Sequence, residues 1–217
     1  NDKKEPTTKP PLSSTSPPPR PHQMEKLDDC CVCLDELSHD IEKNGRALCC
    51  GKQWHMHCHN NAQKSKMSPE LKNRCHHCRT PFPTTDKETL EQLREWVDKD
   101  KAWAQHTMAG LYRDGKCGLK QAYVMAAMLF EKAVKQGDSS AMYELALLYA
   151  EGRGVAQSFE KTAELYAMAA EHGHVKAMYN LGCMYRDGQG VAQSFKKAVE
   201  LYTMAAEQGH VSAMFNL

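Results

Sequence analysis

The sequence predicts two folded parts, a small metal-stabilised domain and, after it, an all-α solenoid built from helix-pair repeats. Eight of the ten cysteines and six of the eleven histidines lie between Cys30 and Cys78. From about residue 102 onward the sequence repeats itself every 36 residues. Such a period in a helical pattern is typical of helix pairs that stack on one another. The length of 217 residues allows one or two domains.

Residues 1–27 precede both parts and contain seven of the ten prolines, among Ser, Thr and Lys. A segment of this composition buries too little apolar surface to offset its chain entropy, so we expect it to be disordered. The run Pro17–Pro21 can bind an aromatic groove as a polyproline helix, but a plain linker is the favoured interpretation.

Residues 28–83 form the cysteine-rich segment, which lacks a long periodic apolar stretch. A disulfide framework is one interpretation of clustered cysteines, but disulfides do not need the accompanying histidines. Mixed Cys and His with C-x-x-C pairs favour zinc, and therefore a reducing, intracellular compartment, cytoplasmic or nuclear. A domain this small is not held together by core burial alone, so the metal would stabilise it.

Four pairs of potential ligands follow one another along this segment, and four ligands per structural zinc ion make eight ligands for two Zn²⁺ ions. Two of the pairs are C-x-x-C turns, one is H-x-x-C, and one is a pair of adjacent cysteines. The pairs are Cys30 and Cys33, Cys49 and Cys50, His55 and Cys58, and Cys75 and Cys78.

The order and spacing of these pairs, together with the runs "CCVCLDEL" and "CHHCRTPF", resemble a RING finger. The resemblance implies a small zinc-stabilised α+β RING-like domain in which alternate pairs share an ion. By this resemblance one ion is bound by Cys30, Cys33, His55 and Cys58, and the other by Cys49, Cys50, Cys75 and Cys78.

Two positions depart from the RING pattern. Lys52 stands where most members have a His or Cys ligand, so adjacent Cys49 and Cys50 would supply both bonds, or His57 would replace one of them. His76 stands where many ubiquitin-active members have proline after the seventh ligand. The second departure weakens the expected contact with a ubiquitin-conjugating enzyme.

Two other positions fit ubiquitin transfer by the same resemblance. Val32 lies between the first two ligands, where the family places an aliphatic residue that contacts the conjugating enzyme. Arg79 follows the last ligand, where a cation often bridges to ubiquitin, although an arginine there is as often simply solvated. No residue of the chain would be catalytic in the covalent sense, because such a ligase acts by positioning its partners.

A connecting helix is expected within residues 84–101. Thr85 and Glu88 form a capping-box pattern, and Leu90, Leu93 and Trp96 recur at helical spacing. We expect this helix to pack the cysteine-rich segment against the repeats, with Trp96 and Trp103 in the core.

Residues 102–217 contain three full repeats and a partial fourth. The copies at 139–174 and 175–210 share 22 of 36 residues, and the first copy has one extra residue near Cys117. Repeating aromatic and methionine positions are expected in the core, among them Tyr149, Tyr185, Met168 and Met204. The partial fourth copy would leave an apolar stripe uncovered, formed by Ala213, Phe215 and Leu217.

The runs "AMYNLGCMYRDGQGV" and "MAAEQGH" resemble the Sel-like repeat, a relative of the tetratricopeptide repeat. The resemblance implies an adaptor that holds other proteins. The whole sequence then predicts a RING-type ubiquitin-protein ligase, which recruits a conjugating enzyme through the zinc domain and a protein substrate through the repeats. The alternative is a non-enzymatic zinc-containing scaffold for protein–protein interactions.

Other classes of partner are not expected. The net charge is +1, and residues 30–79 carry eight Lys and Arg against five Asp and Glu, so nothing favours a nucleic acid. No apolar run approaches the roughly 20 residues of a membrane span.

Overall fold

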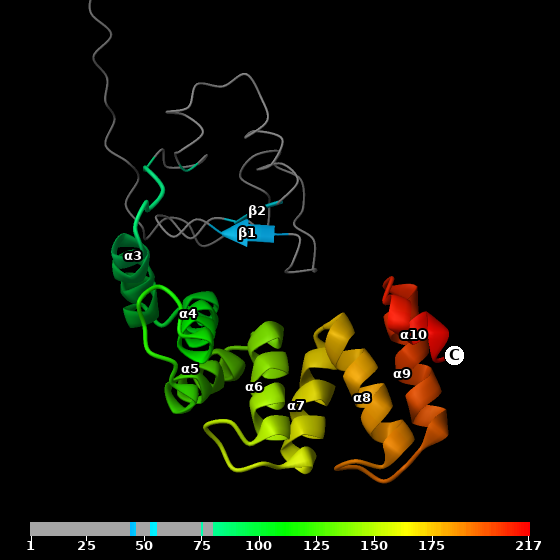
Figure 1. Cartoon of the computed structure of the whole chain (residues 1–217). Coiled ribbons are helices and arrows are strands. Elements are labelled where there is room, and N and C mark those ends of the chain that lie inside the picture. The colour runs from blue at the N-terminus through cyan, green and yellow to red at the C-terminus, as the bar shows by residue number, and fades with distance from the viewer. Residues whose placement is uncertain (1–43, 47–52, 56–74, 76–79) are drawn as a thin grey trace, which may run out of the picture.

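The structure is a computed structural model of the chain and describes residues 44–46, 53–55, 75 and 80–217. The segment 1–27 and most of the cysteine-rich segment lie outside these ranges. Within them the chain forms two short strands and then eight helices (Figure 1). None of these helices is long and apolar enough to cross a membrane.

The strands β1 (Asn44–Arg46) and β2 (Gln53–His55) pair antiparallel. Asn44 lies opposite His55, and Arg46 lies opposite Gln53. The sequence between the two strands, residues 47–52, includes Cys49 and Cys50 and lies outside the described residues.

Helix α3 (Asp86–Asp98) begins at the predicted Thr85 cap, whose hydroxyl oxygen accepts the Glu88 N–H at 3.2 Å. The Glu88 carboxylate accepts the N–H of Thr84 at 2.8 Å, one residue before the position expected of a capping box, and this bond lowers the pKa of Glu88. Trp96 packs on Trp103 with ring centroids 5.7 Å apart. The predicted packing of this helix against the first repeat is therefore confirmed.

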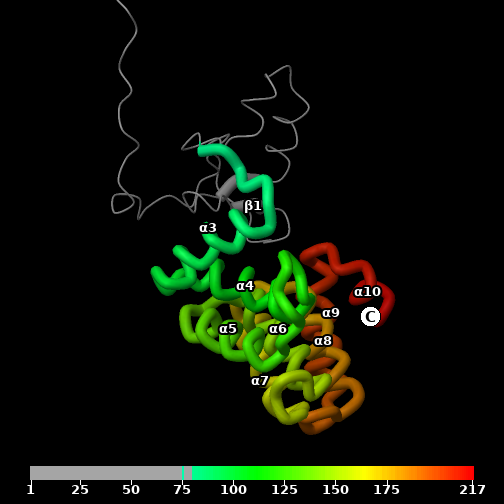
Figure 2. Tube along the Cα trace, turned by 60° about the vertical axis from the view of Figure 1, so that its left-hand side comes forward, coloured from blue at the N-terminus to red at the C-terminus, as the bar shows by residue number. Residues whose placement is uncertain are grey.

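Three helix pairs and one further helix follow, and each helix packs on its neighbours along the chain. Figures 1 and 2 show them in a curved row, with α3 and α10 on the same side of the row. The pairs are α4 (Ala102–Asp114) with α5 (Tyr123–Lys135), α6 (Ser139–Glu151) with α7 (Phe159–Glu171), and α8 (Val175–Asp187) with α9 (Phe195–Glu207), and the last helix is α10 (Val211–Phe215). The predicted all-α solenoid is confirmed for this part of the chain.

Alanines make up much of the core, because a small side chain lets two helices approach closely. Ala109, Ala133 and Ala169 are among those with no exposed surface. Larger side chains, such as Phe130 and Met142, fill the space between the helix layers. The core of each repeat is therefore built from the same few types of side chain.

The second glycine of each Gly-x-Gly turn lets one repeat pack directly against the backbone of the preceding repeat. Gly190 has φ +70, and a Cβ there would lie 2.3 Å from the carbonyl carbon and oxygen of Phe159. Gly154 lies in the same way against the backbone of Tyr123. The first copy has one extra residue in this turn, and Cys117 there has a positive φ of +53.

The prediction that Met168 and Met204 belong to the core is wrong. They are 40% and 45% exposed, so a position that repeats in successive copies is not for that reason covered by a neighbouring helix. The tyrosines of the same prediction are half-buried. Tyr149 and Tyr185 are each covered by a lysine ammonium 4.9 Å from the ring centroid.

The last helix, α10, belongs to the partial fourth repeat, and only some of its apolar residues are covered. Ala213 is fully buried, whereas Phe215 is 85% exposed and Leu217 is also exposed. The expected uncovered stripe is therefore confirmed for the last two of its three residues.

Candidate functional site

A groove of about 470 Å³ crosses the first helices of successive repeats. The first turns of α6 and α8 line it, together with the turns that precede α8 and α10. Its side chains are mainly rings and polar groups, among them His106, His172, His174, His210, Tyr143, Glu144 and Lys176. A groove of this size and polarity can hold a stretch of polypeptide or a small molecule.

Three helix caps recur every 36 residues, and two of them, His174 and His210, line the groove. Asp138 begins α6 by accepting the Ala141 N–H at 2.8 Å. His174 begins α8 and His210 begins α10 in the same way, and each accepts a backbone N–H through Nδ1 at 3.2 Å. These caps satisfy backbone donors that a helix leaves without an intrahelical partner.

Each capping histidine also stacks on a tyrosine from the first helix of the repeat that it ends. His174 lies 4.6 Å from Tyr143 between ring centroids, with 19° between the ring planes. His210 lies 4.6 Å from Tyr179, with 21° between the planes. Each ring thus joins the start of one helix to the side of another.

Hydrogen-bond partners fix which nitrogen of each neutral ring carries the proton. A backbone N–H only donates, so Nδ1 of His174 and of His210 is an acceptor and the proton lies on Nε2. His172 is the opposite case, because its Nδ1 contacts the Met168 carbonyl oxygen at 2.9 Å and must donate. Nδ1 is therefore an acceptor in His174 and His210 and a donor in His172.

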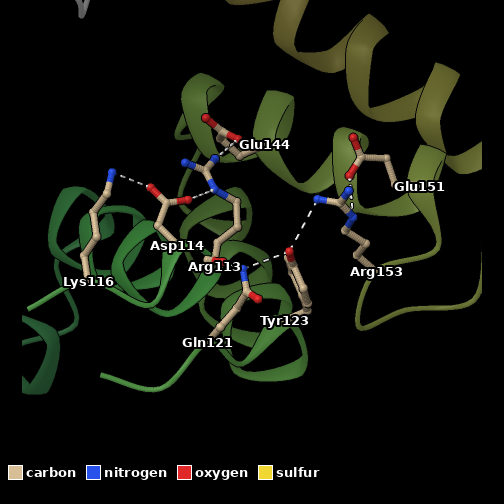
Figure 3. A network of polar contacts seen from close by, with 8 residues as sticks. All are labelled: Arg113, Asp114, Lys116, Gln121, Tyr123, Glu144, Glu151 and Arg153. Atoms are coloured by element: carbon tan, nitrogen blue, oxygen red, sulfur yellow. Dashed lines mark hydrogen bonds and ion pairs between the residues drawn. The ribbon is translucent and has the colours of Figure 1, made fainter. Parts of the chain in front are cut away.

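An ion-pair network ties the first two repeats together beside this groove (Figure 3). Arg113, from the end of α4, binds both Asp114 and Glu144 of α6. Arg113 and Lys116 hold the pKa of Asp114 down to about 2. Because Glu144 lines the groove, the pairing with Arg113 offsets the negative charge of its carboxylate there.

The second part of the network joins the turns that follow the first helices. Gln121 donates to the Arg113 carbonyl at 2.8 Å and to the Tyr123 hydroxyl at 2.9 Å. Arg153 donates to the same hydroxyl at 3.4 Å and pairs with Glu151 at 3.0 Å (Figure 3). These contacts fix one repeat against the next, with no reactive group among them.

The predicted zinc ligands fall almost entirely outside the described residues. Of the eight, His55 lies at the end of β2 and Cys75 is fully buried. The Cys75 N–H donates to the Thr80 carbonyl at 2.8 Å. Cys30, Cys33, Cys49, Cys50, Cys58 and Cys78 lie outside the described ranges, as do His57, Val32 and Arg79.

Among the residues that the structure describes, no three His, Cys, Asp or Glu side chains are grouped as a metal site. The groove histidines are therefore not arranged as metal ligands. Sequence reasoning gave His174 and His210 no role in a site, although a signal was present. Asp138, His174 and His210 stand one period apart, each just before an apolar helix, where capping residues belong.

Comparison with known proteins agrees with this geometry. The Sel1 repeat family model matches at residues 104–138, 139–174 and 175–210, so this part of the chain is similar to three successive Sel1 repeats. Each match covers one helix pair, α4–α5, α6–α7 or α8–α9, and the first match begins two residues inside α4. No curated protein matches the chain at a significant level.

Two solved structures are similar to the helical part. One is c5321, a protective antigen of uropathogenic Escherichia coli strains with an SLR fold, at 26% identity and a TM-score of 0.59 over 62% of this chain. The other is a Sel1 repeat protein from Oxalobacter formigenes, at 28% identity and a TM-score of 0.56 over 59% of this chain. The matches span only 28% and 53% of those two proteins, respectively.

Proposed function

We propose that the Sel1 repeats of this chain are a scaffold for protein–protein interaction and bind a protein partner along the histidine-lined groove. The carrying observation is that one groove of about 470 Å³ crosses three successive repeats. A polypeptide segment is long enough to use contacts repeated at each period, as solenoid surfaces allow. Sel1 repeats are used as interaction scaffolds, which agrees with this proposal.

A charge reversal inside the groove tests this proposal against a matched reversal elsewhere. Lys176 lines the groove, whereas Lys132 is exposed on α5 and is not part of it. Proteins that co-purify with the full chain, identified by mass spectrometry, should be lost with Lys176→Glu and kept with Lys132→Glu. Equal retention by both variants would contradict binding in the groove.

We further propose that the cysteine-rich segment binds two Zn²⁺ ions as a RING-type domain. The donor set supports this, because seven thiols and one imidazole suit two closed tetrahedral zinc sites. The complete burial of Cys75 also supports it, since a structural zinc ligand is shielded from water. The ions would hold the segment folded, with Cys30, Cys33, His55 and Cys58 around one and Cys49, Cys50, Cys75 and Cys78 around the other.

Native mass spectrometry of the full chain tests the metal content directly. Two zinc ions per chain are expected. One ion per chain would rule out the crossed arrangement, and none in a folded protein would rule out the zinc domain. Variants Cys50→Ser and His57→Asn decide which residue completes the second site, because only the true ligand lowers the count.

The two modules together are proposed to act as a ubiquitin-protein ligase inside the cell, in the cytoplasm or the nucleus. The zinc domain would bind a ubiquitin-conjugating enzyme through Val32 and steady the bound ubiquitin through Arg79, while the repeats bind the protein to be modified. The chain would act by holding the two reactants in reach of each other.

The second candidate function is a non-enzymatic zinc-containing scaffold. Lys52 and His76 favour it, because both depart from the pattern of ubiquitin-active RING domains. A panel of conjugating enzymes that gives no self-ubiquitination of a zinc-loaded, folded chain would support the scaffold and contradict the ligase.

A further inference from the structure

We infer that the start of α5 is a second interaction surface, which binds a short amphipathic segment of a partner protein. This surface, called the α5 patch, consists of Val124, Met125 and Met128, which are 59%, 43% and 52% exposed. Val124 and Met125 precede Met128 by four and three residues, so the three side chains lie on one face of the helix. The α5 patch is therefore a contiguous apolar surface in contact with solvent.

The other repeats show that the fold does not require apolar side chains at these positions. The equivalent residues are all charged and exposed, and they are Glu160, Lys161 and Glu164 in α7 and Lys196, Lys197 and Glu200 in α9. Lys161 and Lys197 each cover a tyrosine ring at 4.9 Å, so a charged side chain serves the packing at the second position. Among the three full repeats, only the first combines apolar side chains at all three positions.

Exposed methionines also occur on α7 and α9, but each stands among charged residues. A glutamate lies four residues before and three residues after each of them, which are Glu164 and Glu171 for Met168 and Glu200 and Glu207 for Met204. Single exposed apolar side chains are ordinary on a protein surface, whereas a contiguous group indicates an interaction site. The α5 patch differs from the other helices in this respect.

Positive charge borders the start of the α5 patch. Arg153 of the next repeat lies over the Tyr123 ring, 5.4 Å from its centroid (Figure 3), and Glu151 offsets part of its charge at 3.0 Å. Lys120 is exposed four residues before Val124, and none of the ion pairs among the described residues involves it. The helix start adds the positive end of its dipole. Beyond the patch, the next two exposed residues of α5 carry opposite charges, so the border favours a carboxylate near the helix start.

The size of the α5 patch indicates a short segment rather than a second copy of the chain. Three side chains exposed to this degree offer roughly a few hundred Å², whereas each partner in a stable dimer buries about 800 Å². A short helix with two or three apolar side chains at helical spacing covers a surface of this size. The occupant that fits is therefore an amphipathic segment whose apolar face ends in carboxylates.

The α5 patch and the groove lie at opposite ends of the helix pairs. The groove is lined by the first turns of α6 and α8 and by the turns before α8 and α10. The start of α5 instead lies at the turn that follows α4, where Gly154 of the next repeat packs on the Tyr123 backbone. A helix of 13 residues is about 20 Å long, so a partner in the groove leaves the α5 patch open.

Fluorescence anisotropy with the full zinc-loaded chain tests the inference with a defined probe. The probe is a labelled synthetic helical peptide with leucines at positions i, i+3, i+4 and i+7 and glutamates at one end of this apolar face. The unaltered chain should bind it. A peptide with serines in place of the leucines should not bind, and a peptide with lysines in place of the glutamates should bind at least about fivefold more weakly.

A variant built from the chain's own repeats locates the binding. Val124→Glu with Met125→Lys and Met128→Glu gives α5 the exposed residues that α7 has, so its thermal unfolding should match that of the unaltered chain. Its affinity for the probe should be at least about tenfold lower, because the apolar contacts are lost and carboxylates face the glutamates. Lys196→Glu with Glu200→Lys changes the equivalent face of α9 and should leave the affinity unchanged.

Four results would overturn the inference, and none of them depends on a partner in the groove. The first two are no binding of the probe by the unaltered chain and equal affinity of the folded triple variant. A dimer in sedimentation that the triple variant abolishes would assign the α5 patch to a second copy. Binding to phosphatidylserine vesicles that the triple variant abolishes would assign it to a membrane surface.

Discussion

The helix pairs α6–α7 and α8–α9 share 22 of 36 residues, yet their equivalent tyrosines end in different contacts. The Tyr166 hydroxyl accepts a hydrogen bond from Asn180 of the next repeat at 3.1 Å. The Tyr202 hydroxyl instead donates to Cys183 Sγ, on the partner helix of its own repeat, at 3.4 Å. Tyr166 and Tyr202 occupy equivalent positions of the repeat, yet their hydroxyl groups form hydrogen bonds to different helices.

The residues opposite each ring explain the difference. Ala146 and Leu147 stand in the first pair where Gly182 and Cys183 stand in the second. A Cβ at Gly182 would lie 2.7 Å from the Tyr202 ring, so glycine opens the space that the ring occupies. The repeated tyrosine is therefore buried in both pairs, whereas the residues that differ around it determine which hydrogen bond its hydroxyl group forms.

The largest effect is expected at a glycine that both pairs share in the turn. Gly190→Ala should destabilise the chain by about 3 kcal/mol, because the new Cβ would be forced into the Phe159 backbone in addition to the strain of a positive φ. Chemical unfolding followed by circular dichroism measures the change.

Gly173→Ala is the matched control for this prediction. Gly173 also has a positive φ, of +79, but no other atom lies within 4 Å of the added Cβ. Its cost should be about 1–2 kcal/mol, from backbone strain alone. Equal costs at the two glycines would contradict the close contact between successive repeats.

A smaller effect is expected from removing the two hydroxyl groups. Tyr166 is 4% exposed, and Tyr166→Phe leaves the Asn180 amide without this partner, so a loss of about 1–2 kcal/mol is expected. Tyr202→Phe should cost less than about 1 kcal/mol, because a thiol sulfur is a weak acceptor. The free energies of unfolding of the two variants, measured side by side, test the order, and a larger loss for Tyr202→Phe would reverse the interpretation.

The smallest effect is expected at the glycine that distinguishes the pairs. Gly182→Ala should stabilise the helix by about 1 kcal/mol through its higher helix propensity. Displacement of the Tyr202 ring by the added Cβ should cost a similar free energy, so the free energy of unfolding should change by less than about 1 kcal/mol. The displaced hydroxyl should leave Cys183, so peptide-resolved alkylation of that thiol should become faster. A large loss of stability would contradict this prediction, because it would mean that the Tyr202 ring cannot move away from the added Cβ.

Much of the helical part follows from its sequence. The 36-residue period, the glycine turns and the Thr85 cap predict where helices begin and end, because local signals determine these features. The period alone did not distinguish Met168 from Tyr166. Both repeat faithfully, but only the three-dimensional stack decides which side of α7 a neighbour covers.

The groove was missed for a related reason. Its histidines lie far apart in the sequence, and only the stacking of repeats brings His106, His174 and His210 to one surface. For the predicted zinc domain the situation is reversed. The ligand order predicts the site in detail, while the structure describes Cys75 and the backbone of His55 among its members.

The central claim is that the zinc domain and the repeats form one zinc-dependent ligase, and self-ubiquitination reconstituted from purified components tests it most directly. The full zinc-loaded chain should form polyubiquitin with at least one conjugating enzyme of a panel. Zinc-depleted chain should form none, and Val32→Ala should lower the rate strongly, with Lys132→Glu as the unaffected control. Polyubiquitin that persists in both zinc-depleted chain and Val32→Ala, or a folded zinc-loaded chain inactive with every enzyme of the panel, would contradict the claim.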